Sequence, residues 1–222
     1  MIRGNAPSSG DLSRDGACIY VVDDDQSVRE ALSSLFRSVG YQVQLFGSTT
    51  DFMKVRLADS NRCLVLDIRL PGVSGLDLQN HLNRNQILIP IIFMTGHGDI
   101  PMSVRAMKAG AIDFLSKPFR DQDMLDAVAH ALDIDRNRRE AEHSVAAVRS
   151  AFESLTSRER EVMMLVTAGL MNKQVAGQLE LSEITVKIHR GNVMKKMAAQ
   201  SLADLVRMAE LLSLGSTKSQ SR

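Results

Sequence analysis

The stretch Cys18-Ile-Tyr-Val-Val-Asp-Asp-Asp25 contains five residues suited to a buried strand, followed at once by three acidic residues. A run of strand length without polar alternation is typical of a parallel strand that is covered on both faces. Further runs of this kind occur at Cys63–Leu66, Ile89–Met94 and Ala111–Leu115. The segment Tyr41–Phe46 instead alternates apolar and polar residues, which favours an edge strand with one wetter face.

Segments with a helical period separate these runs. Between the strands predicted at Cys18–Val22 and Tyr41–Phe46, apolar residues recur at Val28, Leu32, Leu35 and Val39. This is the spacing of one face of an amphipathic helix. Strand and helix alternate five times in this way. The pattern predicts an α/β fold, a five-stranded doubly wound parallel sheet with helices on both faces.

The composition points to the cytoplasm. The longest nearly unbroken apolar run, Ile87–Met94, has eight residues, whereas a membrane-spanning helix needs about 20. The N-terminal segment, residues 1–16, is polar and lacks the apolar core of a signal peptide. Two cysteines, Cys18 and Cys63, begin apolar runs, so we interpret them as buried thiols in a reducing compartment. We therefore expect a cytoplasmic protein without membrane contact.

Polar residues stand at the ends of four of the predicted strands. Asp23 and Asp24 follow the first, Asp67 the third, Thr95 the fourth and Lys117 the fifth. Because the carboxyl ends of parallel strands meet at one edge, these side chains should converge there. Three carboxylates repel one another unless a cation lies among them, and a hard divalent ion such as Mg²⁺ fits oxygen ligands. A hydroxyl and an ammonium beside them favour a phosphoryl group as the further partner. For the acidic triplet alone, a solvated turn is the alternative.

The charge of the chain is unevenly distributed. Residues 1–135 carry 13 Lys and Arg against 17 Asp and Glu, whereas residues 156–222 carry ten against six. An acidic first part joined to a basic last part indicates two units with different partners, and the basic part suggests nucleic acid.

The last part of the sequence is predicted to be helical throughout. Thr156 and Glu159 form a capping box, Gly169 ends that helix, and Asn172 and Ser182 are placed to cap the next two. The predicted divisions are a disordered tail at 1–16, an α/β domain at 17–134, a charged helical linker at 135–154, an all-α domain at 155–212 and a disordered tail at 213–222. The apolar stripe of the linker indicates either a short coiled coil or a solvated helix without a partner.

The helix predicted at 183–197 has two distinct faces. Val186, Val193 and Met197 share one face and should pack inward. The opposite face carries Ile188, Gly191 and Lys195 and is flanked by Lys187. Ile188 suits contact with a thymine methyl group and Lys187 with a guanine edge in the major groove. A solvated basic face is the alternative. The candidate DNA-binding residues are Lys173, Thr185, Lys187, Ile188, Arg190, Gly191, Lys195 and Lys196.

The first part resembles the receiver domain of two-component response regulators. The resemblance is carried by Val21-Val-Asp-Asp24, Leu66-Asp67 with Pro71-Gly72, Met94-Thr95-Gly96 and Ser116-Lys117-Pro118. It implies the flavodoxin-like strand order 2-1-3-4-5 and a Lys117–Pro118 peptide bond that is a candidate for the cis form. It also implies Asp67 as phosphoacceptor, and Asp23, Asp24, Asp67 and the backbone carbonyl of Arg69 as Mg²⁺ ligands. Lys117 would bind the phosphate, and Thr95 and Phe114 would form the switch pair; many relatives have Tyr where Phe114 stands.

The helical part resembles the helix-turn-helix domain of the LuxR/NarL type, carried by Asn172-Lys-Gln-Val-Ala176 and Thr185-Val-Lys-Ile-His189. Together with Gly98-Asp-Ile-Pro-Met102, the combination is similar to the FixJ branch, which typically contains transcription activators. The resemblance implies a sensor histidine kinase, promoter DNA and RNA polymerase as partners. The helix predicted at 202–212 resembles the family's dimerisation helix, so we expect a homodimer when phosphorylated, although internal packing of its stripe is the alternative.

The expected function is therefore a DNA-binding response regulator, not an enzyme, in which phosphorylation of Asp67 switches dimerisation and promoter binding. Two other classes are compatible with parts of the sequence. Asp23-Asp-Asp25 after a first strand is similar to the nucleophile motif of haloacid-dehalogenase-like phosphatases, but that reading leaves Asp67 and the basic helices unexplained. A DNA-binding protein whose receiver no longer accepts phosphate is the third possibility.

Overall fold

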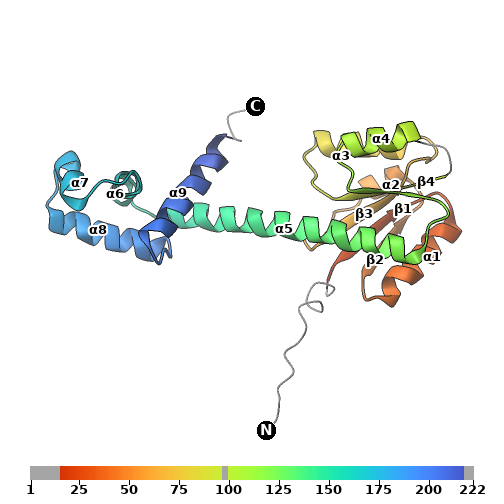
Figure 1. Ribbon diagram of the computed structural model, residues 1–222, viewed down its shortest axis with the longest axis horizontal. Helices are drawn as coiled ribbons and strands as arrows, with labels where there is room; N and C mark the ends of the chain where they lie inside the picture. Colours follow the sequence, from red (N-terminus) through yellow and green to blue (C-terminus); the bar gives the residue numbers. More distant parts are fainter. Residues whose placement is uncertain (1–15, 97–99, 218–222) are drawn as a thin grey trace, which may run out of the picture. The chain divides into compact units, whose positions relative to one another are not determined.

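The protein is described by a computed structural model that covers residues 16–96 and 100–217 (Figure 1). Residues 1–15 and 218–222, which make up most of the two tails predicted as disordered, lie outside the described residues. The contacts of the chain divide it into two units, with the boundary between Arg139 and Glu140. This boundary falls inside the predicted linker, and each unit is described by itself.

The first unit is a five-stranded parallel sheet in the order β2-β1-β3-β4-β5, which confirms the predicted fold class and strand order (Figure 1). The edge position predicted for the second strand is also confirmed. The elements of the sheet and its helices are β1 Cys18–Val22, α1 Gln26–Ser38, β2 Gln42–Phe46, α2 Thr49–Met53, β3 Arg62–Asp67, α3 Gly75–Arg84, β4 Ile91–Thr95, α4 Ile100–Lys108, β5 Asp113–Ser116 and α5 Asp121–Glu153.

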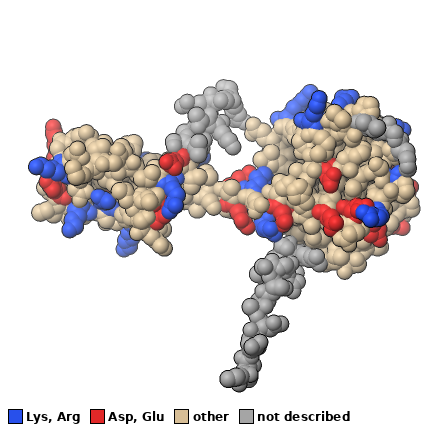
Figure 2. Space-filling model, viewed as in Figure 1, with Lys and Arg blue, Asp and Glu red and all other residues tan. Residues whose placement is uncertain are grey.

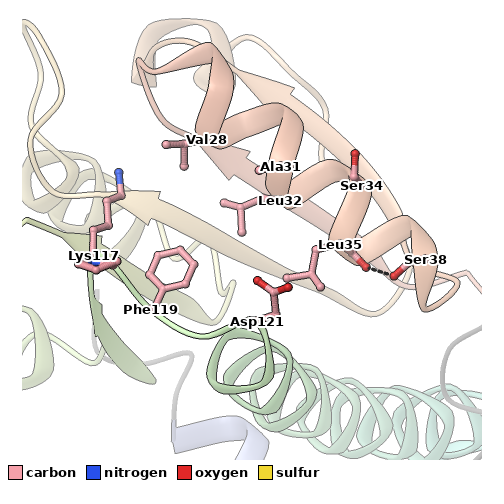
Figure 3. A pocket seen from close by; sticks show the side chains of 10 residues that line it. Val28, Ala31, Leu32, Ser34, Leu35, Ser38, Lys117, Phe119 and Asp121 are labelled. Carbon is pink, nitrogen blue, oxygen red and sulfur yellow. Dashed lines mark hydrogen bonds between the residues drawn. The ribbon is translucent and has the colours of Figure 1, made fainter.

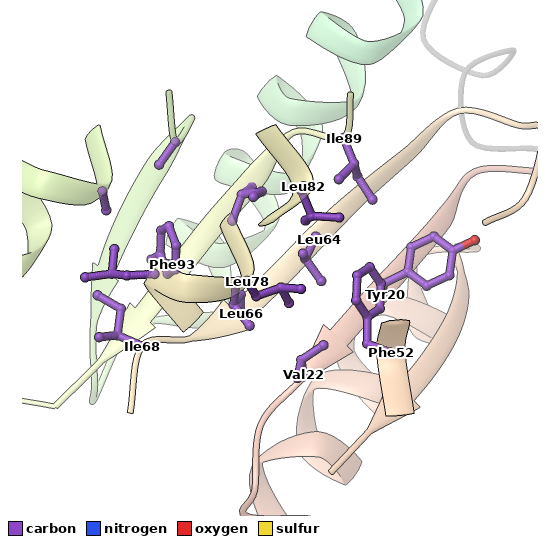
Figure 4. Packing of buried hydrophobic residues seen from close by; sticks show 14 of the residues in the cluster. Tyr20, Val22, Phe52, Leu64, Leu66, Ile68, Leu78, Leu82, Ile89 and Phe93 are labelled. Atoms are coloured by element: carbon purple, nitrogen blue, oxygen red, sulfur yellow. The ribbon is translucent and has the colours of Figure 1, made fainter. Parts of the chain in front are cut away.

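Two apolar clusters fill the two faces of this sheet. One contains Phe52 of α2, Leu78 and Leu82 of α3 and Ala106 of α4, packed on side chains of the central strands such as Leu64 (Figure 4). The other contains residues of α1 and of the first half of α5. Because both faces are covered, β1, β3 and β4 are buried over nearly their whole length, as their apolar runs predicted.

The second unit contains four further helices, α6 Ser157–Thr167, α7 Asn172–Leu179, α8 Glu183–Lys196 and α9 Leu202–Thr217. Their core includes Val162, Val175, Val186, Val193 and Leu205, all buried. The inward face predicted for the 183–197 helix is therefore confirmed. In α9, Ala209 and Leu212 pack against the same core, so part of the predicted dimerisation stripe is used inside the unit.

The helix ends agree with the predicted caps except in α7 and α9. Thr156 and Glu159 form the capping box, and the Ser182 hydroxyl accepts the Thr185 amide. Asn172 is not a cap but the first residue of α7, because the Gln174 side chain accepts the Met171 amide one residue earlier, at 2.8 Å. Helix α9 continues to Thr217, five residues beyond its predicted end at 212.

Helix α5 runs through the predicted linker without a break and contributes to both units. In the first unit its carboxylate Asp135 is fully buried, accepts the Arg62 amide at the start of β3 at 3.0 Å, and pairs with the Arg138 guanidinium at 2.6 Å. In the second unit Val148 and Phe152 pack against the helical core. The C-terminal part of the linker stripe thus packs against the core of the second unit, whereas Ala141 at its beginning is exposed.

Candidate functional site: an acidic sheet edge and a basic helix

The polar residues predicted at the strand ends do meet at one edge of the sheet. Asp67 and Thr95 are the last residues of β3 and β4, while Asp23 and Lys117 directly follow β1 and β5. The strand register explains the convergence, because Val22 pairs with Leu66 and Asp67 pairs with Met94. The parallel topology therefore brings residues far apart in sequence to one place.

The Lys117 ammonium links two of the carboxylates. Its Nζ lies 2.6 Å from Asp23 Oδ2 and 2.6 Å from Asp67 Oδ2. The Asp23 side chain is completely buried, and those of Asp67 and Lys117 are 10% and 25% exposed. The other oxygen of each carboxylate accepts a backbone amide: Asp23 Oδ1 that of Asp25 and Asp67 Oδ1 that of Arg69, both at 2.9 Å. These bonds fix the two carboxylates in well-defined orientations.

Burial and pairing shift the pKa values of this group. Burial raises the pKa of the Asp23 carboxyl above its ordinary value, although the hydrogen bonds from Lys117 and the Asp25 amide oppose the shift. For Lys117, burial works to lower the pKa, but the hydrogen bonds to Asp23 and Asp67 outweigh it and the pKa is raised. The lysine therefore remains an ammonium ion at neutral pH.

Three carboxylates fit a divalent cation. Asp23, Asp24 and Asp67 each offer an oxygen, and these oxygens lie within 4.8 Å of one another. The three negative charges and the single positive charge of Lys117 leave two negative charges, which a divalent ion would neutralise. Oxygen donors of this kind suit Mg²⁺. The predicted fourth ligand, the carbonyl of Arg69, lies in the loop directly after Asp67, and its role stays a prediction.

The loop after β3 comes very close to the site. The Gly75 amide donates to the Ile68 carbonyl at 3.1 Å, and a Cβ at position 75 would lie 2.3 Å from the Asp67 carbonyl oxygen. Only glycine permits this approach, so Gly75 allows the start of α3 to lie close to the end of β3.

The structure also places Thr95 and Phe114, the two residues of the predicted switch pair, whose role stays a prediction. Thr95 is buried, and its carbonyl accepts the Lys117 amide at 2.6 Å. Phe114, in β5, is half-buried and packs against the cluster that contains Phe93. The Lys117–Pro118 bond is cis, as proposed from the sequence.

Sequence reasoning missed a groove beside this edge (Figure 3). Its volume is about 610 Å³, and it lies between α1 and the segment that follows β5. Val28, Leu32 and Leu35 of α1 face Phe119 across it, and Lys117 also lines it. The groove is therefore an apolar surface that reaches a residue of the acidic site.

The candidate DNA-binding residues are mostly exposed. Lys173, Lys187, Ile188, Gly191 and Lys195 are exposed and Thr185 is half-buried. Figure 2 shows Lys and Arg side chains gathered over α8. Ile184, which sequence reasoning passed over, is 74% exposed at the start of α8, one turn before Ile188 at 59%. Its spacing of four residues from Ile188, away from the face that carries Val186 and Val193, was the sequence signal that could have identified it.

Two of the candidate cations have partners inside the unit. The Lys196 ammonium lies 2.7 Å from Glu159 Oε2, and the Glu159 side chain is only 5% exposed. The Arg190 guanidinium donates to the Asn172 side chain at 3.1 Å. These contacts tie α8 to the beginnings of α6 and α7, so Lys196 and Arg190 help to hold the unit together.

Within the described residues, no helix has the length and apolar character needed to span a membrane.

Comparison with known proteins gives two family matches along the chain. Residues 19–129 match the family described as "Response regulator receiver domain", and residues 153–209 match "Bacterial regulatory proteins, luxR family". Nodulation protein W of Bradyrhizobium diazoefficiens is 60% identical over 204 residues, covering 92% of this chain and 90% of that protein. Transcriptional regulatory protein FixJ of Rhizobium meliloti is 42% identical over 200 residues, covering 86% and 94%.

Solved structures extend the similarity to the fold. The response regulator StyR is 49% identical with a TM-score of 0.81, covering 87% of this chain and 98% of that one. The resemblance predicted from the sequence is thereby confirmed for both parts. The chain belongs to the FixJ/NarL-type DNA-binding response regulators, in which a receiver domain precedes a LuxR-type helix-turn-helix domain.

Proposed function

We propose that Asp67 accepts a phosphoryl group from a sensor histidine kinase in a Mg²⁺-dependent step, and that this modification controls binding to promoter DNA. The observation that carries the proposal is the placement of Lys117, whose ammonium bonds both Asp23 and Asp67 at 2.6 Å next to a third carboxylate. A carboxylate nucleophile beside a fixed cation and a divalent-ion site has the groups that phosphoryl transfer needs.

In the proposed reaction, an Asp67 carboxylate oxygen attacks the phosphorus of a phosphohistidine. A new O–P bond forms and the P–N bond breaks, and its electron pair remains on the imidazole nitrogen, which takes up a proton. Asp23, Asp24 and Asp67 would hold Mg²⁺, which neutralises charge on the phosphoryl oxygens. Lys117 moves from the carboxylate of Asp67 to a phosphoryl oxygen, where it provides a second fixed positive charge.

The groove between α1 and the segment after β5 supports a protein donor. A phosphohistidine must approach within bonding distance of Asp67, so the protein that carries it has to cover the surface around Lys117. The apolar side chains that line the groove give such a partner area to bury at that place.

Phosphorylation is proposed to act through Thr95 and Phe114. The new dianion would draw the Thr95 hydroxyl toward it, and Phe114, which has no hydroxyl, would respond through packing alone. Each tenfold shift in the odds of the active state needs about 1.4 kcal/mol. One charge-assisted hydrogen bond contributes roughly that amount.

The output is proposed to be transcription activation in the cytoplasm. A phosphorylated homodimer would bind an inverted repeat with half-site centres roughly 34–36 Å apart, and RNA polymerase would be recruited there. The exposed face of α8, with Lys187 and Ile188, supports insertion of this helix into the major groove.

The test is phosphorylation of the full chain by a small-molecule phosphodonor with Mg²⁺, followed by intact mass. We expect wild type to gain one phosphoryl group, about 80 Da, and to lose this gain in EDTA. Asp67→Asn should take up none while keeping its circular dichroism spectrum. Asp126→Asn, a change at an exposed carboxylate of α5, is the matched control and should behave as wild type. Equal labelling of Asp67→Asn and wild type would refute the proposal, as would an unlabelled wild type.

A further inference from the structure

Arg29 reaches back from α1 to the turn that carries the acidic residues. Its Nη1 donates to the backbone carbonyl oxygen of Asp23 at 2.6 Å, six residues earlier in the chain. The side chain is half-buried, and it packs beside Gly47 in the loop after β2, where a Cβ would lie 3.7 Å from the same nitrogen. The guanidinium thus lies between the backbone of the acidic turn, at Asp23, and the loop after β2, at Gly47.

The bonded carbonyl belongs to the peptide between Asp23 and Asp24. A peptide unit is planar, so holding its oxygen also fixes the direction of its N–H and the position of the next Cα. Arg29 therefore constrains the position of the Asp24 Cα and the direction in which the Asp24 side chain leaves the backbone.

Asp24 depends on this backbone constraint more than its neighbours do. The side chain of Asp23 is held by Lys117 and by the Asp25 amide, and that of Asp25 accepts the Ser27 amide at 2.8 Å. Among the described residues, the structure gives Asp24 no side-chain hydrogen bond, and Asp24 is exposed. Its oxygen nevertheless lies within 4.8 Å of ligand oxygens of Asp23 and Asp67.

We propose that Arg29 is a positioning residue of the cation site: by holding the Asp23–Asp24 peptide, it keeps the Asp24 carboxylate directed at the place where the metal binds. The inference rests on the proposed function of that site and adds a residue outside the acidic cluster. A purely electrostatic role predicts the opposite effect, because a nearby guanidinium repels Mg²⁺.

The experiment is calorimetric titration of the metal-free full chain with MgCl₂, without phosphodonor. We expect Arg29→Met to raise the Kd for Mg²⁺ by roughly three- to tenfold. Without the hydrogen bond from Arg29, the Asp23–Asp24 peptide and the Asp24 carboxylate should sample other orientations. Arg29→Lys, which keeps a cationic donor, should restore most of the affinity. Arg37→Met makes the same change at an exposed arginine of the same helix and should leave the Kd unchanged.

A second readout separates positioning from general destabilisation. In EDTA, the backbone amide resonances of Asp24 and Asp25 should shift in Arg29→Met, while those of Met94 and Val65 stay in place. If Arg29→Met does not fold, Arg29→Gln, whose shorter amide cannot reach the carbonyl, takes its place with the same expectation.

An unchanged or lower Kd in the folded variant would overturn the inference, and a lower one would assign Arg29 a repulsive role only. Unmoved amide resonances of Asp24 would overturn it as well. In either case, wild-type uptake of Mg²⁺ and phosphate would leave the proposed function intact. A wild type that binds no Mg²⁺ would instead count against the proposed function itself.

Discussion

Lys196 and Lys195 are neighbours in α8, yet the structure predicts that their replacement has different consequences. Lys196 pairs with the nearly buried carboxylate of Glu159, which also accepts the Thr156 amide at 2.9 Å. Lys195 is exposed. Lys196→Met should therefore destabilise the helical unit, whereas Lys195→Met should weaken DNA binding and leave stability nearly unchanged.

The magnitude follows from the pKa of Glu159. The Lys196 ammonium and then the Thr156 amide lower the pKa of Glu159 from 4.5 to about 2. At 1.36 kcal/mol per pKa unit, this corresponds to about 3 kcal/mol of preference for the charged form. Because Lys196 is 37% exposed and screened by water, we expect about 1–2 kcal/mol from its removal.

The sign of the pH dependence is set by the lowered pKa. The pair contributes its full stabilisation above pH 4.5, the ordinary pKa of a glutamate, and loses it as pH falls toward 2. In Lys196→Met the pKa of Glu159 should return toward 4.5, so this acid-sensitive part of the stability should shrink.

The assay is amide hydrogen exchange of the full chain at neutral pH, read at the buried residues Val162 and Val166 of α6. A loss of 1–2 kcal/mol should speed the exchange about 5- to 30-fold in Lys196→Met, and Lys195→Met should exchange like wild type. The reasoning is refuted if Lys196→Met keeps wild-type protection, above all if it weakens DNA binding as much as Lys195→Met does.

Three further changes test other parts of the structure. Gly75→Ala should destabilise the receiver by about 1–3 kcal/mol in denaturant melts, because its Cβ meets the Asp67 backbone; Gly177→Ala, with open space around the added methyl, should be neutral or stabilising. Asp135→Ala should cost about 1–3 kcal/mol by leaving the Arg62 amide without its acceptor, and Asp135→Asn should cost less; equal melting of the two variants would contradict this. Lys187→Ala should weaken operator binding by about 1–3 kcal/mol if it contacts a base, and an equal loss on random DNA would show a phosphate contact instead.

The acidic edge could be predicted because it depends on local patterns and one topological rule. Apolar runs located the strands, and parallel strands place their carboxyl ends together, so Asp67 and Lys117 could be assigned to one place although 50 residues separate them. The alternation of apolar residues with Gln42 and Gln44 in Tyr41–Phe46 likewise identified β2 as the edge strand. In each case the period of the sequence carries the information.

What escaped prediction depends on side-chain contacts between elements. Nothing in the helical period of α8 distinguishes Lys195 from Lys196; only the packing of α6 against α8 places Glu159 beside the second of them. The hydrogen bond from Arg29 to the Asp23 carbonyl and the groove next to α1 also depend on contacts that the period of the sequence does not reveal. The predicted end of α9 at residue 212 was too early. Ser213 and Gly215 are weak helix formers, but the helix continues through both to Thr217.

The shared helix α5 has a practical consequence for dissecting the protein. The LuxR-type match begins at residue 153, but the core of that unit also takes in Val148, Ala151 and Phe152, and the Phe152 ring stacks beneath Arg160 at 5.3 Å. A DNA-binding fragment that begins at residue 153 would therefore lack side chains that pack against the core of its helical unit. A fragment that keeps the whole core of this unit should therefore begin at or before Val148, more than one helical turn upstream of the family match.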